Sequence, residues 1–123
     1  MNKILLDTDV VINLLKKREE TLRQLEMLNE AEFYLSPIVI AEIFAGARPN
    51  EAAQIEQFIS LCTSTVVDDR IGRIAGEYAH DFRKAYSGIS LEGYMIAATA
   101  KAYGLTLWTY NQKHYPMDDI RKL

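Results

Sequence analysis

Short segments that favour β-strands alternate with longer helical segments along this 123-residue chain. The strand-like segments span residues 3–6, 32–35, 65–67 and 105–109. Because such alternation places helices on both faces of a parallel sheet, we expect a three-layer α/β/α domain with four or five parallel strands. The length suffices for one hydrophobic core but not for two, so residues 1–123 should form a single domain.

Capping residues indicate where the helices begin. Asp9 is the expected N-cap of the first helix and Asn50 that of the fourth. Ser36 followed by Pro37 suits the start of the third helix, because a proline costs little at the first helical position. The expected helices span residues 10–17, 20–31, 36–46, 50–61, 69–86 and 90–103.

The overall composition, 49% apolar and 25% charged, is that of an ordinary soluble globular chain. No apolar run reaches the roughly 18 residues that a membrane span needs. The N-terminus has neither the apolar stretch nor the small-residue cleavage site of a secretory signal. The single cysteine, Cys62, cannot form an internal disulfide, which suits a reducing compartment. We therefore expect a cytoplasmic protein that does not enter a membrane.

The net charge of −3 does not by itself favour nucleic-acid binding, because neutralising phosphates takes lysine and arginine. The basic residues nevertheless gather in short clusters, which are Lys16 to Arg18, Arg70 with Arg73, Arg83 with Lys84, and Lys113 with His114. Some of the acidic excess should lie at a metal site, where the ion would offset it.

Two carboxylates have surroundings that suggest a bound partner. Asp7 follows the first strand directly, a position that taken alone is typical of a turn or capping residue. Asp9 can already serve as the N-cap of the following helix, so Asp7 is not needed for capping and is available for another role. Glu42 lies in an apolar helical stretch, where its neighbours at helical spacing are Ile38, Val39, Ala45 and Gly46. An acid in such surroundings is costly unless it is paired, and a metal ion is one such partner.

Asn111 follows the last strand and can supply a carbonyl oxygen, although a turn residue is a strong alternative. Ligands of parallel sheets bind beyond the carboxyl ends of the strands. We therefore expect Asp7, Glu42 and Asn111 to converge on one pocket that binds Mg²⁺ or Mn²⁺ through oxygen ligands. The hydroxyls of Thr8 and Thr109 could hydrogen-bond the ligating carboxylates, or could be simple strand-edge groups.

Three blocks, in this order, resemble the PIN-domain ribonucleases, in particular the VapC-type toxins of bacterial and archaeal toxin–antitoxin pairs. The blocks are residues 3–7, residues 36–46, and residues 95–100 with 104–115. The resemblance implies a metal-dependent endoribonuclease that is cytoplasmic and homodimeric. It also implies a small VapB-like antitoxin, which in this family typically inserts a C-terminal segment into the acidic groove.

One acid of the family pattern is missing. The pattern has an aspartate three residues before Ile96, where this chain has Gly93. An acid there would complement the helix dipole and could form a capping box with Ser90. The adjacent Glu92 lies about 100° away around the helix, but its longer side chain could reach the site by another route. The alternatives are an inactive natural member, or a loss of activity by engineering or selection.

Arg83, Lys113 and His114 are the residues we expect to contact RNA. By the resemblance, Arg83 matches a position that often carries arginine in this family. It could bind phosphate, pair with a carboxylate of the site or be only a surface residue. His114 is the more plausible phosphate contact of the two histidines, because it lies beside Lys113.

Two rival functions stay open. Residues 4–10 match the opening of HAD phosphohydrolases, in which Asp7 would be a phosphoryl nucleophile, and Asp68 with Asp69 mimics their late acidic pair. No strand supplies the serine or threonine and the lysine that such enzymes need before Asp68, and Glu42 would have no role. The second rival is a non-catalytic module that binds RNA or an antitoxin, which Gly93 favours.

Overall fold

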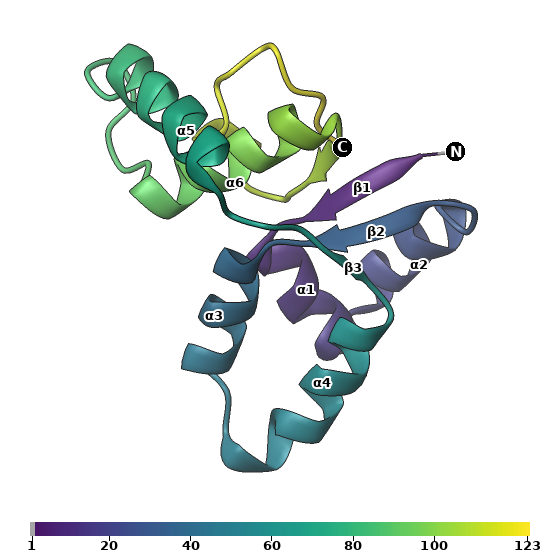
Figure 1. Ribbon diagram of the computed structural model, residues 1–123. Coiled ribbons are helices and arrows are strands. Elements are labelled where there is room, and N and C mark those ends of the chain that lie inside the picture. Colours follow the sequence, from purple (N-terminus) through teal and green to yellow (C-terminus); the bar gives the residue numbers. More distant parts are fainter. Residues whose placement is uncertain (1) are drawn as a thin grey trace.

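The computed structural model describes residues 2–123 and contains one four-stranded sheet (Figure 1). The strands are β1 (Lys3–Leu6), β2 (Glu32–Leu35), β3 (Thr63–Ser64) and β4 (Thr106–Trp108). They lie in the order β3-β2-β1-β4, and all three pairings are parallel. The prediction of a parallel sheet with four or five strands is confirmed.

Helices cover both faces of the sheet, α5 and α6 on one side and α1 to α4 on the other (Figure 1). The helices are α1 (Thr8–Leu15), α2 (Glu19–Met27), α3 (Pro37–Ala45), α4 (Ala52–Ser60), α5 (Asp69–Phe82) and α6 (Leu91–Tyr103). Two short 3₁₀ helices are η1 (Pro49–Glu51) and η2 (Gln112–His114). Among the residues described, no helix is long and apolar enough to cross a membrane.

The third helix begins as expected, since Ser36 caps it through Ile38 N and Pro37 occupies the first helical position. Two expected caps are wrong. Asp7, not Asp9, caps α1 by accepting from Thr8 N at 2.8 Å, so the helix begins two residues earlier than predicted. Asn50 lies inside η1, and this extra turn delays the start of α4.

The third strand is shorter and earlier than residues 65–67. Thr65 follows the strand, and its backbone nitrogen at 2.9 Å and its hydroxyl at 3.3 Å both donate to Leu35 O. Val66 is 62% exposed, and its N–H donates to the hydroxyl of Tyr103 instead of to a strand. A β-branched sequence did not extend the strand, because β3 is an edge strand with a single neighbour.

The core is centred on β1, where Ile4, Leu5 and Leu6 are each at most 1% exposed. Burial on both faces is what a parallel sheet between helices requires. β1 and β4 pair in register, Leu6 with Trp108. The residues that follow these two strands therefore leave the sheet side by side, and this places the site.

Candidate active site

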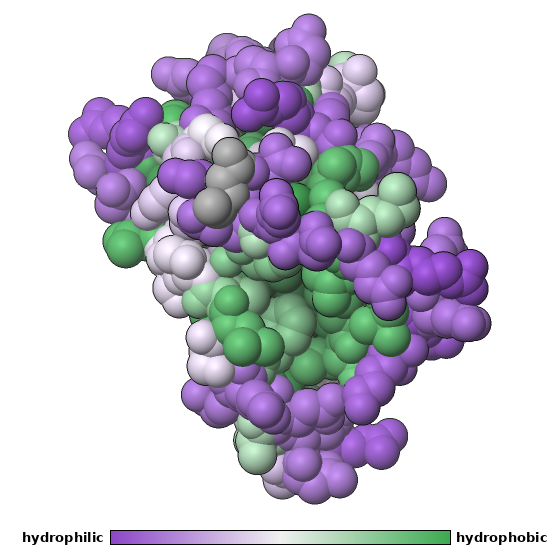
Figure 2. Space-filling model, turned by 90° about the vertical axis from the view of Figure 1, so that its right-hand side faces the viewer, coloured by the Kyte–Doolittle hydropathy of each residue, from purple (hydrophilic) through white to green (hydrophobic). Residues whose placement is uncertain are grey.

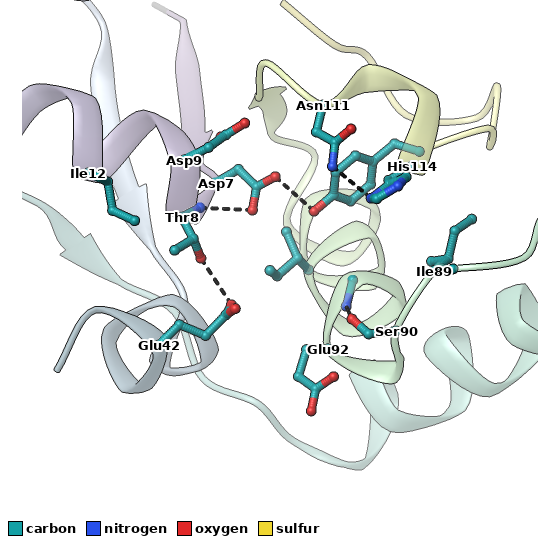
Figure 3. Close-up of a pocket in the computed structure, with 14 residues that line it drawn as sticks. Asp7, Thr8, Asp9, Ile12, Glu42, Ile89, Ser90, Glu92, Asn111 and His114 are labelled. Atoms are coloured by element: carbon teal, nitrogen blue, oxygen red, sulfur yellow. Dashed lines mark hydrogen bonds between the residues drawn. The ribbon is translucent and has the colours of Figure 1, made fainter. Parts of the chain in front are cut away.

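A pocket of about 280 Å³ opens at the carboxyl ends of β1 and β4 (Figure 3). Its side chains come from α1, α3, the start of α6 and the loop that follows β4. Residues that line it include Asp7, Thr8, Asp9, Glu42, Glu92, Gly93, Asn111, His114 and Tyr115. The fold thus brings together the three expected metal ligands and the position of the missing acid.

Asp7 is held by three hydrogen-bond donors and is only 8% exposed. Thr8 N donates to Oδ1 at 2.8 Å. The hydroxyls of Thr109 and Tyr115 donate to Oδ2 at 2.8 and 3.0 Å. Burial raises the pKa of Tyr115 far above its usual value, and the nearby Asp7 adds to the shift, so this hydroxyl stays protonated and keeps donating. The Asp7 carboxylate is therefore fixed in one orientation.

Glu42 is exposed, so the predicted apolar surroundings are wrong. Val39 and Ile43 take the buried side of α3, whereas the Glu42 side chain extends into the pocket (Figure 3). Thr8 links the two acids, because its backbone nitrogen bonds Asp7 and its hydroxyl donates to Glu42 Oε1 at 2.9 Å. The two carboxylates are therefore held beside the same space without a burial cost for Glu42.

Asn111 is positioned by two neighbours. Its backbone nitrogen donates to Thr109 Oγ1 at 3.0 Å, the same hydroxyl that bonds Asp7. Its side-chain nitrogen Nδ2 lies 2.7 Å from His114 Nδ1 (Figure 3). Because the amide NH₂ can only donate, Nδ1 accepts and the amide oxygen of Asn111 is left for another partner.

Asp9 and Tyr115 are site residues that the sequence analysis missed. Asp9 Oδ2 accepts from Tyr110 N at 3.0 Å, whereas its Oδ1 is buried with no partner among residues 2–123. Burial, and secondarily the charge of Asp7, raise the pKa of Asp9. The spacing of Asp9, two residues after Asp7, could have indicated that Asp9 also belongs to the site. Nothing in the sequence indicated that η2 would return Tyr115 to Asp7.

Gly93 occupies the first turn of α6, where its nitrogen donates to Ser90 Oγ at 3.1 Å. A Cβ at this position would lie 3.5 Å from Ile89 Cγ2 and 3.6 Å from Ser90 Oγ, which are ordinary contacts. The backbone therefore accommodates a side chain here. Glu92 lines the same pocket, but its carboxylate points away from Asp7 (Figure 3).

The three predicted RNA contacts lie in different places. His114 lines the pocket and bonds Asn111. Arg83 is exposed at the C-terminal cap of α5, and Lys113 is exposed in η2. Neither of these two cations is among the residues that line the acidic pocket.

The donor set of the pocket is that of a hard cation. Asp7, Glu42 and the amide oxygen of Asn111 offer oxygen atoms only, which suits Mg²⁺ or Mn²⁺. The unpartnered, buried oxygen of Asp9 adds negative charge beside Asp7, and a cation would offset it. In the part of the chain described, no three acidic, histidine or cysteine side chains cluster closely enough to form a complete metal cage. The residues present therefore fit a cation that keeps several of its waters.

The alternative of a HAD phosphohydrolase does not fit this geometry. Asp68, the first of its expected late acidic pair, caps α5 by accepting from Ile71 N at 3.1 Å. It does not line the pocket that contains Asp7.

Comparison with known proteins agrees with the fold. The family model described as "PIN domain" matches residues 4–120. Ribonuclease VapC19 of Mycobacterium tuberculosis is 36% identical, with 92% of each chain covered. Ribonuclease VapC2 of Haemophilus influenzae is 28% identical, over 94% of this chain and 91% of the relative.

Solved structures with the same fold include DNA-bound VapBC from Salmonella typhimurium. It aligns with a TM-score of 0.85 at 24% identity, over 100% of this chain and 98% of that one. VapBC2 from Rickettsia felis, bound to a promoter DNA fragment, aligns with a TM-score of 0.84 at 22% identity, over 98% and 97%.

Proposed function

Since the chain belongs to the PIN-domain family, among its VapC-type ribonucleases, we propose that the acidic pocket hydrolyses RNA phosphodiester bonds with Mg²⁺ or Mn²⁺. The observation that carries the proposal is the convergence of Asp7, Glu42 and Asn111 on one pocket at the carboxyl ends of β1 and β4. A bound divalent cation supplies an activated water and neutralises charge that develops on the phosphate.

The residues of the chain would share the remaining tasks. Asp7, Glu42 and the amide oxygen of Asn111 would hold the cation. Thr109 and Tyr115 fix the orientation of Asp7, and Thr8 fixes the relative position of the two acids. Such orienting hydrogen bonds matter, because a ligand that rotates freely loses part of its affinity for the metal.

Gly93 weakens the proposed site. A carboxylate here would join Asp7 and Glu42 as a third acid of the cation site and would offer another oxygen ligand or water contact. Glu92 is the nearest acid along the chain, and we propose it as the substitute if this chain retains activity. The second candidate function, a non-catalytic module that binds RNA or an antitoxin, is favoured by the same glycine.

Cleavage of single-stranded RNA tests the proposal. Asp7→Asn and Glu42→Gln should each abolish cleavage in a Gly93→Asp background, as should EDTA. Glu56→Gln is the matched control, because Glu56 is an exposed acid on α4, outside the pocket. Cleavage that survives Asp7→Asn and EDTA would exclude this pocket as the metal-dependent site.

We also propose that Arg83 and Lys113 contact phosphates at the rim of the site, since both are exposed. Because the net charge of the chain is negative, the lysine and arginine side chains that neutralise RNA phosphates must be concentrated at the binding site. Charge reversal at both positions should weaken RNA binding and flatten its dependence on salt. Unchanged binding at low salt would exclude them.

A VapB-like antitoxin is the proposed protein partner, as in the VapBC complexes that share the fold. An apolar pocket of about 370 Å³ lies between α2 and the end of α4, and its lining includes Leu25, Leu28, Phe58 and Leu61. Figure 2 shows an apolar area framed by polar side chains on this side of the molecule. We propose that apolar side chains of the antitoxin occupy it.

Leu61 is 79% exposed, so Leu61→Asp should disrupt the antitoxin complex without disturbing the fold. Leu91→Asp, at a 57% exposed position on α6, is the control. If both variants bind the antitoxin equally well, the antitoxin does not bind in this apolar pocket. The homodimer and the cytoplasmic location stay predictions, and light scattering of the purified chain tests the first.

A further inference from the structure

A second pocket adjoins the acidic pocket, and Asp9 lines both. It has a volume of about 530 Å³ and lies between the end of α1, the start of α2 and the loop after β4. Asn13, Arg18, Arg23 and Tyr110 contribute to its walls. A chain that occupied the acidic pocket could therefore continue directly into this one.

Tyr110 forms a rigid aromatic wall of the second pocket. Its hydroxyl lies 2.9 Å from Thr21 Oγ1 and also donates to Gln24 on α2. Its backbone nitrogen donates to Asp9. The ring meets Trp108 edge to face, at 6.5 Å between centroids, yet the residue stays 41% exposed. Both ends of the residue are thus fixed while part of the ring is open to the pocket.

Arg18 gives this pocket a cation without a carboxylate partner among residues 2–123. The other arginine, Arg23, is engaged with Glu19 at 3.5 Å. Glu19 and Glu20 also line the pocket, whereas Lys16 and Lys17, which directly precede Arg18, are exposed. By contrast, no lysine or arginine among the described residues lines the acidic pocket.

We propose that the second pocket binds one nucleotide of single-stranded RNA beside the bond that is cut, with its base stacked on Tyr110 and a phosphate at Arg18. The proposal rests on the proposed ribonuclease function. An exposed, pre-fixed aromatic ring next to a free guanidinium is the combination with which proteins hold single strands, because every base offers a stacking face and every nucleotide a phosphate. Duplex RNA would not bind here, since its bases are already stacked.

Binding of a labelled single-stranded RNA oligonucleotide in EDTA and low salt, measured by fluorescence anisotropy, tests the subsite without cleavage. Tyr110→Leu and Arg18→Ala should each weaken binding by roughly tenfold. Tyr110→Phe keeps the ring and should restore most of the affinity. Arg18→Ala should also lower the salt slope by about 0.7, the value for one phosphate on a single strand. Arg73→Ala is the control, because Arg73 is exposed on α5 and pairs with Asp69.

An RNA series with one abasic nucleotide at each successive position separates stacking from a purely structural role of Tyr110. One abasic position should cost the parent chain roughly tenfold in affinity and cost Tyr110→Leu nothing further. If no position shows this difference, or if Arg18→Ala and Arg73→Ala bind alike, the subsite is wrong although the ribonuclease function stands. If the parent binds no RNA in low salt, both proposals fail.

Discussion

The side-chain nitrogen of Asn111 lies 2.7 Å from Nδ1 of His114. This contact orients the amide, because the NH₂ group is taken by the histidine and the oxygen is left for a cation. His114 was expected to touch RNA phosphate. In the structure its Nδ1 positions a proposed metal ligand. The RNA contact of His114 stays a prediction.

The orienting role predicts that His114→Leu weakens metal binding by roughly tenfold, the usual scale for a residue behind a ligand. His114→Asn should restore much of it, because the asparagine oxygen takes approximately the place of Nδ1. Mn²⁺ titration followed by electron paramagnetic resonance measures both, with a thermal melt as the folding control. Equal Mn²⁺ affinities for the leucine and asparagine variants would contradict this role.

Tyr115→Phe should lower the free energy of unfolding by roughly 1–2 kcal/mol, since it removes one hydrogen bond to the buried Asp7 carboxylate while keeping the ring. Tyr103→Phe is the matched control. It removes only a bond from Val66 N at an exposed position, and should cost less. Urea unfolding measures the free energy of unfolding of both variants. A larger loss for Tyr103→Phe than for Tyr115→Phe would contradict the stabilising role of the Tyr115 hydroxyl.

Asp9→Asn should raise the melting temperature at pH 7 in EDTA. Burial and the charge of Asp7 raise the pKa of Asp9 in the folded state, so the ionised form destabilises the fold above that pKa. Asparagine keeps an acceptor for Tyr110 N and carries no charge. The gain should shrink as the pH falls from 7 toward about 4, and it should be absent at lower pH, where the acid is protonated in the folded and unfolded states alike. A gain that stays constant between pH 3 and 7 would rule out this charge effect.

Gly93→Ala should stabilise the metal-free fold by about 0.5–1 kcal/mol, because the helix position has room for a Cβ. Gly93→Asp should add capping and dipole contributions, for a total of roughly 0.5–2 kcal/mol, reduced by repulsion from Asp7 and Glu42. Denaturation with and without Mg²⁺ separates these effects, since the aspartate variant should gain more stability from the cation than the alanine variant does. If alanine gains as much from Mg²⁺, position 93 is not part of a cation site.

The carboxyl ends of the first and last strands were the reliable part of the sequence analysis. Asp7 and Asn111 were placed at one sheet edge because parallel strands end there together. The exposure of Glu42 could not be predicted, because α3 is apolar on most sides and only packing decides which side is buried. The cap of α1 was misassigned because Asp7 and Asp9 are both suitable, and the tertiary contact of Asp9 with Tyr110 decided between them.

Contacts made by irregular segments also could not be predicted from the sequence. Tyr115 reaches Asp7 only because η2 turns the chain back after β4. Its position carries no periodic or capping signal. The two-residue β3 was misplaced for a similar reason, since an edge strand that short is fixed by its neighbour and not by its own residues.

Mg²⁺-dependent cleavage of single-stranded RNA by this chain and by its Gly93→Asp variant, side by side, is the decisive measurement for the acidic pocket as a metal-dependent ribonuclease site. We expect that the variant cleaves much faster than this chain, that EDTA stops the cleavage, and that Asp7→Asn in the same background abolishes it. Equal cleavage by the two chains would show that another residue supplies the third acid, and Glu92→Gln would then be the next variant. A Gly93→Asp variant that folds, binds RNA and cleaves nothing would show that the acidic pocket is not a ribonuclease site.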